Sequence, residues 1–415
     1  MKYSMVLASS NDTAIRDRGE YGGAVTSLLK YALESELVDA VLAVKARNGD
    51  RFDGVPVLVS EPGELDSTSG SLHFAVPNIA RFLKEYMDGV PDQKIAVTCK
   101  PCDAKSIIEL AKREQIHREN LLLVGLNCTG TFMPGKARVM IRDILGVDPD
   151  DVVHEDIDEG VLKLGLRDGS EITRDLYPLE MEGYGRRENC RRCDTSIPVM
   201  ADIACGKWGS GDGNETFIEG FTEKGDKLIE AAVAENYIKV TEPSEASVKA
   251  REEKILDAVQ RAQGWQEHDF SLLKQSNLED RLGYWVSQFN QCIKCFGCRD
   301  ACPICYCADC YLEADNGLVV GGEVPPNILF PLTRIAHVMD SCVNCGQCQD
   351  ACPMEIPISR FTHMMSKEIS EVFDYQPGED LDRVPPLRAP GTDQELNIKG
   401  ITLSLSHESK ASSDD

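Results

Sequence analysis

Two runs of four cysteines in the second half of the chain have a spacing that can hold iron-sulfur clusters. Each run reads Cys-x-x-Cys-x-x-Cys-x-x-x-Cys-Pro, first over residues 292–303 and again over residues 342–353. Three thiolates spaced in this way along a tight turn can bind three corners of one 4Fe-4S cube, and the fourth cysteine reaches the other cube. We therefore predict one cluster on Cys292, Cys295, Cys298 and Cys352, and a second on Cys342, Cys345, Cys348 and Cys302.

Two other roles fit these runs less well. Structural zinc needs only four thiolates per ion and no Cys-Pro at the end of a run. Disulfides are rare in cytosolic proteins. The chain has 17 cysteines, an odd number concentrated at two- and three-residue spacings, which favours metal clusters in a reducing compartment.

Four more cysteines predict a third 4Fe-4S cluster in the first half of the chain. Cys102 and Cys128 each follow an apolar segment with a strand pattern, and Cys190 and Cys193 form a Cys-x-x-Cys half-site. Open α/β sheets bind their ligands at the carboxyl ends of their strands, so the first two cysteines are expected at one shared site. Together the four supply the thiolates for one cluster.

Four arginines surround this half-site, in a chain whose formal net charge is −25. Two interpretations of them remain open. They either neutralise a cluster, a cofactor phosphate or carboxylates, or they form a patch that faces a partner or solvent. The residues concerned are Arg186, Arg187, Arg191 and Arg192.

Composition limits the classes of protein that the chain can belong to. The chain has 415 residues with 42% hydrophobic and 27% charged residues, which is typical of a soluble globular protein with two or three domains. Its strong negative charge argues against binding nucleic acid or anionic membranes through a general basic field. No apolar run reaches the roughly 18 residues that span a bilayer, and the N-terminus lacks the apolar core of a signal peptide. We therefore expect a cytoplasmic protein without a membrane span.

The elements that must position these cysteines alternate between strand and helix patterns. A helix with one apolar face is predicted over residues 24–33, directly after Gly22-Gly23. Paired glycines let a ligand approach the backbone, and the free N–H groups of the helix start favour phosphate, although such a pair is also common in simple turns. Strands are predicted over residues 3–8, 38–44, 94–98, 121–126, 201–206, 215–222 and 237–240, helices over 103–113 and 226–235, and β-hairpins over 152–178.

This pattern predicts four parts. Residues 1–240 form an α/β (α+β) domain with a mixed sheet and one cluster, and residues 241–280 form a helical linker. Residues 281–375 form a bacterial-ferredoxin-like domain with two clusters, in which helices near 328–340 and 358–373 pack around the cysteines. The proline-rich, polar residues 376–415 form a C-terminal tail.

The order of the motifs resembles that of the β subunits of coenzyme F420-reducing hydrogenases and formate dehydrogenases. The matching segments are residues 22–29, 38–41, 101–102, 125–128, 190–194 and 201–209. The chain departs from the family at Cys99, where Gly-Thr-Pro-Cys is usual over 99–102, and at Cys205, where serine is common. By this resemblance Cys102 rather than Cys99 is the cluster ligand, and Cys99 and Cys205 are spare thiols.

The resemblance implies that the first domain binds FAD and exchanges hydride with its substrate, coenzyme F420. F420 takes two electrons as hydride whereas each cluster carries one, so a flavin is needed to convert between them. No acid or base is expected, because hydride transfer needs mainly the alignment of two rings. The flavin candidates that the family motifs give are Gly22, Gly23, Val25, Thr26, Ser71, Pro101 and Asn127.

The position of the paired runs implies a subfamily and partners. A cluster domain on the C-terminal side, preceded by Gly283-Tyr284-Trp285, resembles the formate dehydrogenase β subunits. Nothing in the chain resembles a molybdopterin domain, so the expected partners are a catalytic molybdopterin α subunit and a heterodisulfide reductase complex. Three alternatives remain: a β subunit of another F420-reducing enzyme (a hydrogenase or an F420H2 dehydrogenase), a flavin-less iron-sulfur subunit linked to heterodisulfide reductase, and a zinc-stabilised interaction protein.

Three cysteines outside the twelve predicted ligands follow the first run closely. Cys305, Cys307 and Cys310 could hold another metal with one outside ligand, or could be reduced, buried thiols. The pattern favours the second interpretation, because the sequence offers no fourth ligand nearby.

Overall fold

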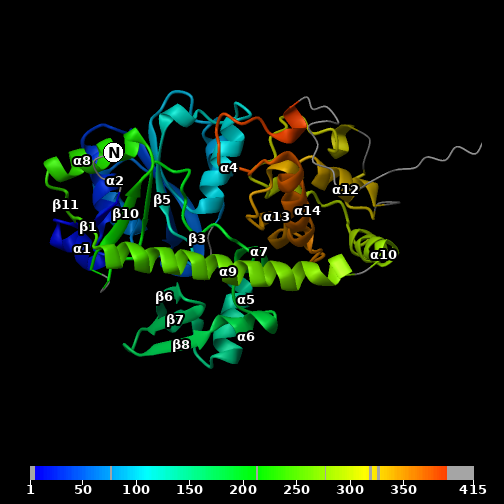
Figure 1. The fold of residues 1–415 in the computed structure, drawn as a ribbon, viewed down its shortest axis with the longest axis horizontal. Helices are drawn as coiled ribbons and strands as arrows, with labels where there is room; N and C mark the ends of the chain where they lie inside the picture. Colours follow the sequence, from blue (N-terminus) through cyan, green and yellow to red (C-terminus); the bar gives the residue numbers. More distant parts are fainter. Residues whose placement is uncertain are drawn as a thin grey trace, which may run out of the picture.

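The computed structural model describes residues 5–74, 77–211, 214–275, 277–316, 320–324 and 328–389. An α/β part with a large sheet and a helical part with the paired cysteine runs lie side by side, and one long helix passes along both (Figure 1). No helix in these ranges is long and apolar enough to cross a membrane. Most of the predicted polar tail, from residue 390 on, lies outside the described residues.

The large sheet is mixed, as the sequence predicts. Its eight strands follow the order β11-β1-β10-β9-β5-β4-β2-β3, in which β2, β4, β5 and β9 are parallel neighbours and the other pairs are antiparallel. The strands are β1 (Met5–Ser10), β2 (Ala40–Arg47), β3 (Asp50–Val59), β4 (Ile95–Cys99), β5 (Leu121–Leu126), β9 (Ile203–Gly206), β10 (Thr216–Gly220) and β11 (Ile238–Thr241).

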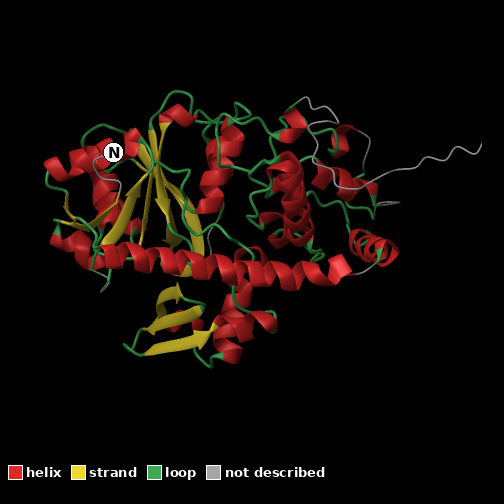
Figure 2. Cartoon of the chain, viewed as in Figure 1, coloured by secondary structure: helices red, strands yellow, loops and turns green. Residues whose placement is uncertain are grey.

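Helices cover both faces of this sheet (Figure 2). Neighbouring residues of each buried strand point to opposite faces, so the parallel strands are apolar along most of their length. Leu122 and Val124 of β5 pack with α2 (Ala24–Glu34) and α8 (Glu223–Ala234), whereas Leu121 and Leu123 pack with α3 (Ala80–Tyr86) and α4 (Pro101–Ala111). The continuous apolar run that predicts β5 therefore reflects burial on two sides.

The β2–β3 hairpin is an element that the sequence interpretation missed. Asn48 and Gly49 both have left-handed backbones, with φ of 54° and 78°, as a two-residue hairpin turn requires. The signal was present in the sequence, because Asn-Gly between apolar segments is a strong hairpin indicator. The hairpin adds β3 as an edge strand.

A second, three-stranded antiparallel sheet forms a lobe on the other side of the long helix (Figure 1). It confirms the hairpins predicted over residues 152–178, including the turn at Asp168-Gly169. The lobe comprises β6 (Val152–Asp158), β7 (Val161–Leu166), β8 (Glu171–Asp175), α5 (Pro134–Val139) and α6 (Leu176–Met181).

The predicted linker is a single helix, α9 (Glu245–Gln275), which contacts several parts of the chain. Its Arg251 pairs with Glu219 of β10, and its Lys254 pairs with Asp158 of the lobe. Farther along, Asp269 pairs with two arginines beside the Cys-x-x-Cys. Helix α9 therefore holds these parts together as well as linking them.

The paired cysteine runs fold as a structural repeat. In each run a short helix follows a residue with a left-handed backbone, Phe296 with φ of 60° and Gly346 with φ of 74°. The helices of this part are α10 (Leu278–Phe289), α11 (Gly297–Asp300), α12 (Leu329–Ala336), α13 (Gln347–Asp350) and α14 (Ile358–Phe373). Helix α14 matches its predicted range, whereas α12 ends four residues before residue 340.

A buried carboxylate on α4 fastens the end of the described chain to the α/β part. Glu109 is fully buried and accepts hydrogen bonds from the Tyr375 hydroxyl at 2.5 Å and the Gly378 N–H at 2.7 Å. Lys112 and Arg113 supply its positive partners at 3.0 and 2.7 Å. Burial would raise the pKa of Glu109, but the Tyr375 hydrogen bond and the two cations outweigh it and lower that pKa.

Replacing Glu109 by Ala should therefore destabilise the chain strongly. The change leaves Lys112 and Arg113 buried without a counter-charge, which costs about 3–5 kcal/mol. Urea unfolding should show this loss, and limited proteolysis should cut near residue 378. Glu114→Ala, at an exposed position just after the same helix, should change stability by less than about 0.5 kcal/mol. Equal stability of the two variants would refute the role of Glu109.

Candidate cofactor sites

Three neighbouring cavities contain nearly all of the predicted site residues. The first, of about 260 Å³, lies at the carboxyl ends of the parallel strands, and we call it the sheet-edge cavity. The second, of about 70 Å³, is lined by Cys102, Cys128, Cys190 and Cys193, and we call it the Cys102 cavity. The third, also of about 70 Å³, is lined by all eight cysteines of the paired runs, and we call it the twin-run cavity.

The sheet-edge cavity receives five of the seven flavin candidates. These are Gly23, Val25, Thr26, Ser71 and Asn127. Pro101 instead lines the Cys102 cavity next door. Gly22 lines neither, and a Cβ there would lie 2.3 Å from the backbone oxygen of Asn214, so this glycine is needed for close backbone packing.

The N-terminus of α2 opens into this cavity. Gly23 caps the helix with a left-handed backbone and no side-chain hydrogen bond, and the next three residues line the cavity. The first N–H groups of an α-helix have no partner within the helix and attract anions. This end of the eleven-residue helix therefore fits a phosphate group.

Asn127 presents a polar group without a partner at the end of β5. Both the nitrogen and the oxygen of its side-chain amide are buried and lack a hydrogen-bond partner within the described chain. Gly206 leaves room for this amide, because a Cβ there would lie 2.2 Å from the Asn127 nitrogen. Buried polar groups are nearly always hydrogen-bonded, so an amide that lines an open cavity is suited to a bound ligand.

The charges around the sheet-edge cavity are mostly paired within the chain. Glu20 accepts hydrogen bonds from the Ser71 hydroxyl at 2.6 Å and lies 3.3 Å from the His154 ring. Burial would raise the pKa of Glu20, but the His154 and Ser71 hydrogen bonds lower it to about 2. The Ser71 hydroxyl therefore already donates its hydrogen bond to Glu20. Lys207, which also lines the cavity, pairs with Asp156.

Sequence reasoning did not identify several residues of this cavity. Gly206 ends β9, Lys207 and Trp208 follow it, and Tyr21 precedes the paired glycines. The strand pattern before Gly206 was recognised, but its place beside β5 follows only from the sheet order. Knowledge of that pairing would have added Lys207 to the candidates.

The Cys102 cavity is built from two strand ends and a short helix. Cys102 lies in the first turn of α4 after β4, Cys128 follows β5, and Cys190 and Cys193 lie in and just after α7 (Glu188–Arg191). Burial raises the pKa of Cys128 to about 11 and that of Cys193 to about 12. Thiols with such raised pKa values become thiolates only next to a strong positive charge, such as that of bound iron.

The two departures from the family pattern lie apart from these thiols. Cys99 is packed in the apolar core between the sheet and α4, with 1% of its surface exposed, and lines none of the three cavities. Cys205 is buried at the end of β9, on the wall of the sheet-edge cavity. The geometry is thus consistent with Cys102 as the ligand.

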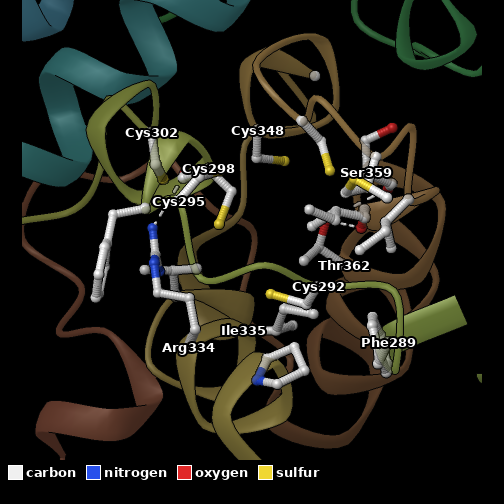
Figure 3. Close-up of a pocket in the computed structure, with 18 of the residues that line it drawn as sticks. Phe289, Cys292, Cys295, Cys298, Cys302, Arg334, Ile335, Cys348, Ser359 and Thr362 are labelled. Carbon is white, nitrogen blue, oxygen red and sulfur yellow. Dashed lines mark hydrogen bonds between the residues drawn. The ribbon is translucent and has the colours of Figure 1, made fainter. Parts of the chain in front are cut away.

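The twin-run cavity is enclosed by cysteines and apolar side chains. Figure 3 shows Cys292, Cys298 and Cys348 around it, with Phe289 and Ile335 in the wall. Within the described residues, no three His, Cys, Asp or Glu side chains converge on a point that a single ion would occupy. The eight cysteines are instead distributed around one cavity.

The three cavities share walls. Cys128, Thr129, Gly130 and Trp208 line both the sheet-edge and the Cys102 cavity. Asn344 lines both the Cys102 and the twin-run cavity. The cavities therefore form one continuous series, from the edge of the large sheet to the helical part.

Two asparagines join the cysteine loops of neighbouring cavities. Asn189, which precedes Cys190, donates from its side chain to the backbone oxygen of Asn344 at 3.1 Å. Asn344, which precedes Cys345, donates in return to the backbone oxygen of Asn189 at 2.9 Å. Both side chains are buried. We refer to this reciprocal contact as the asparagine pair.

The arginine-rich segment proves to be internal. Arg187 donates to the Cys345 backbone oxygen at 2.7 Å and pairs with Asp350. Arg186 pairs with Glu180, and the remaining two arginines, Arg191 and Arg192, both pair with Asp269 of α9. Of the two interpretations, neutralisation of carboxylates describes these contacts, and a solvent-facing patch does not.

Cys305, Cys307 and Cys310 line none of the three cavities. Cys310 is buried, Cys305 is half-buried and Cys307 is exposed. The backbone oxygen of Cys305 accepts a hydrogen bond from Lys84 of α3 at 2.7 Å. This segment therefore contributes to the contact between the two parts of the chain.

Comparison with known proteins gives a consistent family. Residues 5–82 match the N-terminal part, and residues 92–246 the C-terminal part, of the family described as coenzyme F420 hydrogenase/dehydrogenase, beta subunit. The chain is 44% identical to the F420-dependent formate dehydrogenase subunit beta of Methanocaldococcus jannaschii, over 93% of this chain and 99% of that protein. It is 43% identical to F420-dependent formate dehydrogenase 1 subunit beta of Methanococcus maripaludis, over 93% of this chain and 98% of that protein.

More distant relatives match a smaller share of the chain. The coenzyme F420 hydrogenase subunit beta of Methanococcus voltae is 28% identical over 55% of this chain and 82% of that protein. A chain of the F420-reducing [NiFe] hydrogenase complex from Methanosarcina barkeri has a similar fold, with a TM-score of 0.55 and 21% identity over 65% of this chain and 92% of that chain.

The asparagine pair leads to a prediction at Gly346. A Cβ there would lie 2.0 Å from the Asn189 side-chain oxygen, whereas the equivalent position of the first run is Phe296, which adopts the same left-handed backbone. Glycine at 346 thus makes room for Asn189. Gly346→Ala should cost about 1–3 kcal/mol in urea unfolding, the usual penalty for overpacking.

The double variant Gly346→Ala/Asn189→Ala provides the control. It removes the clashing amide, so it should be more stable than the sum of the two single changes predicts. Additive losses would show that Gly346 is required for its backbone conformation alone.

Proposed function

The chain belongs to the family of coenzyme F420 hydrogenase/dehydrogenase beta subunits, and from that premise we propose that it is the flavin and iron-sulfur subunit of an F420-dependent formate dehydrogenase. The observation that carries the proposal is the series of three cavities with shared walls, which connects a ligand cavity at the sheet edge to one cavity lined by four cysteines and one lined by eight. Coverage of 93% of the chain by the formate dehydrogenase relatives supports the subfamily, since the hydrogenase relative covers only 55%.

FAD is the group that we assign to the sheet-edge cavity. The uncapped N-terminus of α2 at Gly23 would hold its phosphates, with Val25 and Thr26 beside them. The free amide of Asn127 would donate to and accept from polar atoms of the flavin. Bound FAD would supply the exchange between the hydride of reduced F420 and single electrons.

Iron-sulfur clusters are the groups that we assign to the other two cavities, one to the Cys102 cavity and two to the twin-run cavity. The repeat of Cys-x-x-Cys-x-x-Cys with a remote fourth cysteine supports the second assignment, since each run would complete the site of the other. Apolar neighbours such as Phe289 and Ile335 would keep water away from the clusters. The same repeat of cysteine runs is the reason that we propose a ferredoxin-like domain over residues 281–375.

The partners follow from the chemistry that the chain lacks. Formate oxidation would take place on a separate catalytic α subunit with molybdopterin, and this subunit would exchange electrons with the twin-run part. Cys295 of the first run is exposed, so we propose that this run faces such a partner. A heterodisulfide reductase complex as a second partner remains a prediction from the resemblance, and a cytoplasmic location remains a prediction from the composition of the sequence.

Asn127→Leu should weaken FAD binding. The leucine has a similar size but makes no hydrogen bonds, and the loss of two polar contacts should raise the FAD dissociation constant about tenfold or more. Fluorescence of released flavin gives the constant. Asn290→Leu, on the exposed end of α10, serves as a control that should retain normal affinity. Unchanged affinity in Asn127→Leu would remove this residue from the flavin site.

The function itself is tested on the full chain after reconstitution with iron, sulfide and FAD. Such a sample should contain about twelve iron atoms per chain. It should oxidise reduced F420 with a viologen dye as electron acceptor, and it should show no formate activity until a catalytic α subunit is added.

Cys190→Ser provides the internal comparison. It should remove about four iron atoms and most of the viologen reduction, while the spectra of the twin-run clusters persist. Turnover of nicotinamides in place of F420, or formate oxidation by the chain alone, would contradict the proposal. An iron content of eight or fewer in the unaltered chain would remove the Cys102 site from it.

A further inference from the structure

Arg334 of α12 is a buried cation that points into the twin-run cavity. Figure 3 shows its guanidinium extending toward Cys298 and Cys302, which belong to different predicted clusters. Only 6% of the residue is exposed. Its Nη2 donates to the backbone oxygen of Cys298 at 3.2 Å, and its Nε has no partner within the described chain.

Arg334 differs from the other buried arginines in the described ranges. Each of the others forms an ion pair with a carboxylate, and no such pair is found for Arg334. The paired arginines are Arg113 with Glu109, Arg187 with Asp350, Arg191 and Arg192 with Asp269, and Arg251 with Glu219.

A buried guanidinium without a counter-ion is costly, because its charge has left water and has no paired carboxylate to compensate. The groups that face Arg334 are thiols. Cys298 and Cys302 line the cavity, and Cys305 lies beside it. Because the described residues supply no carboxylate for Arg334, its counter-charge would have to be an anion bound in the cavity.

A 4Fe-4S cube held by four thiolates is an anion, and it becomes more negative when it takes up an electron. Its reduction potential depends on the net charge and on the hydrogen bonds around it. A fixed positive charge in a dry cavity stabilises the reduced form more than the oxidised form. A cation placed between two such sites acts on both.

We propose that Arg334 is the shared counter-charge of the two twin-run clusters and raises the reduction potentials of both. This inference rests on the proposed function, because it needs clusters at the paired runs. It goes further by assigning a role to a residue that binds no iron and lies in the segment between the two runs. The positive charge makes both clusters easier to reduce.

The test is a redox titration of the full, iron-loaded chain followed by electron paramagnetic resonance. In Arg334→Met the side chain stays unbranched and apolar along its stem but loses the charged guanidinium. At the midpoint potential of the unaltered chain, the ratio of reduced to oxidised twin-run clusters should fall about tenfold, which corresponds to 59 mV for one electron. The midpoint potential of the cluster at the Cys102 cavity should stay unchanged.

Two controls separate charge from packing. Arg334→Lys keeps the charge, so it should shift the potentials of the twin-run clusters much less than Arg334→Met. Arg251→Met removes a buried arginine of α9 that pairs with Glu219 away from the paired runs, and it should leave the twin-run potentials unchanged. Equal shifts in the lysine and methionine variants, or no shift in the methionine variant at full iron content, would overturn the proposal.

A second substitution covers the case in which Arg334→Met does not take up iron. Cys305 faces Arg334 but belongs to no predicted cluster, so Cys305→Asp would place a carboxylate beside the intact guanidinium. Its negative charge should lower the twin-run potentials, whereas Cys305→Asn should not. Identical potentials in the two variants would also overturn the inference. Absence of iron from the unaltered chain would instead refute the proposed function.

Discussion

The asparagine pair is the contact on which the arrangement of the sites depends. Asn189 and Asn344 each donate to the backbone of the other, at 3.1 and 2.9 Å, and each directly precedes a cysteine that lines a different cavity. Buried polar groups that satisfy each other in this way are specific, since any displacement leaves two amides and two carbonyls without partners. The pair therefore fixes how the Cys102 cavity meets the twin-run cavity.

The surrounding structure holds this contact with buried charges. Asp269 of α9 binds both Arg191 and Arg192, and Glu109 of α4 binds the segment that follows α14. Each is a paired charge in a dry contact between segments far apart in the chain. Such pairs contribute little net stability but are costly to break, so they favour one relative placement of the two parts. The clusters and flavin that we assign to the cavities need a fixed placement of the two parts, because the rate of electron transfer depends on the distance between the cofactors.

The sequence predicted what local spacing determines. The repeated cysteine runs, the apolar strand β5 and the amphipathic α14 were identified because their patterns span only a few residues. The family motifs indicated the sheet-edge residues from Gly23 to Asn127, and five of the seven candidates line one cavity. What local patterns cannot show is pairing over long distances. Tertiary contacts determine the order of strands, which brings Lys207 to the same cavity. They also determine the burial of the arginines around Cys190 and the position of Arg334 beside the cysteines of both predicted clusters.

The most direct measurement of the central claim is rapid mixing of the iron-loaded, flavin-loaded chain with reduced F420, followed by freezing and electron paramagnetic resonance. If the three cavities form one route, electrons from F420 alone should give the signals of reduced iron-sulfur clusters, including those at the paired runs, within the time of F420 oxidation. Clusters that stay oxidised with F420, yet are reduced directly by dithionite, would contradict the account.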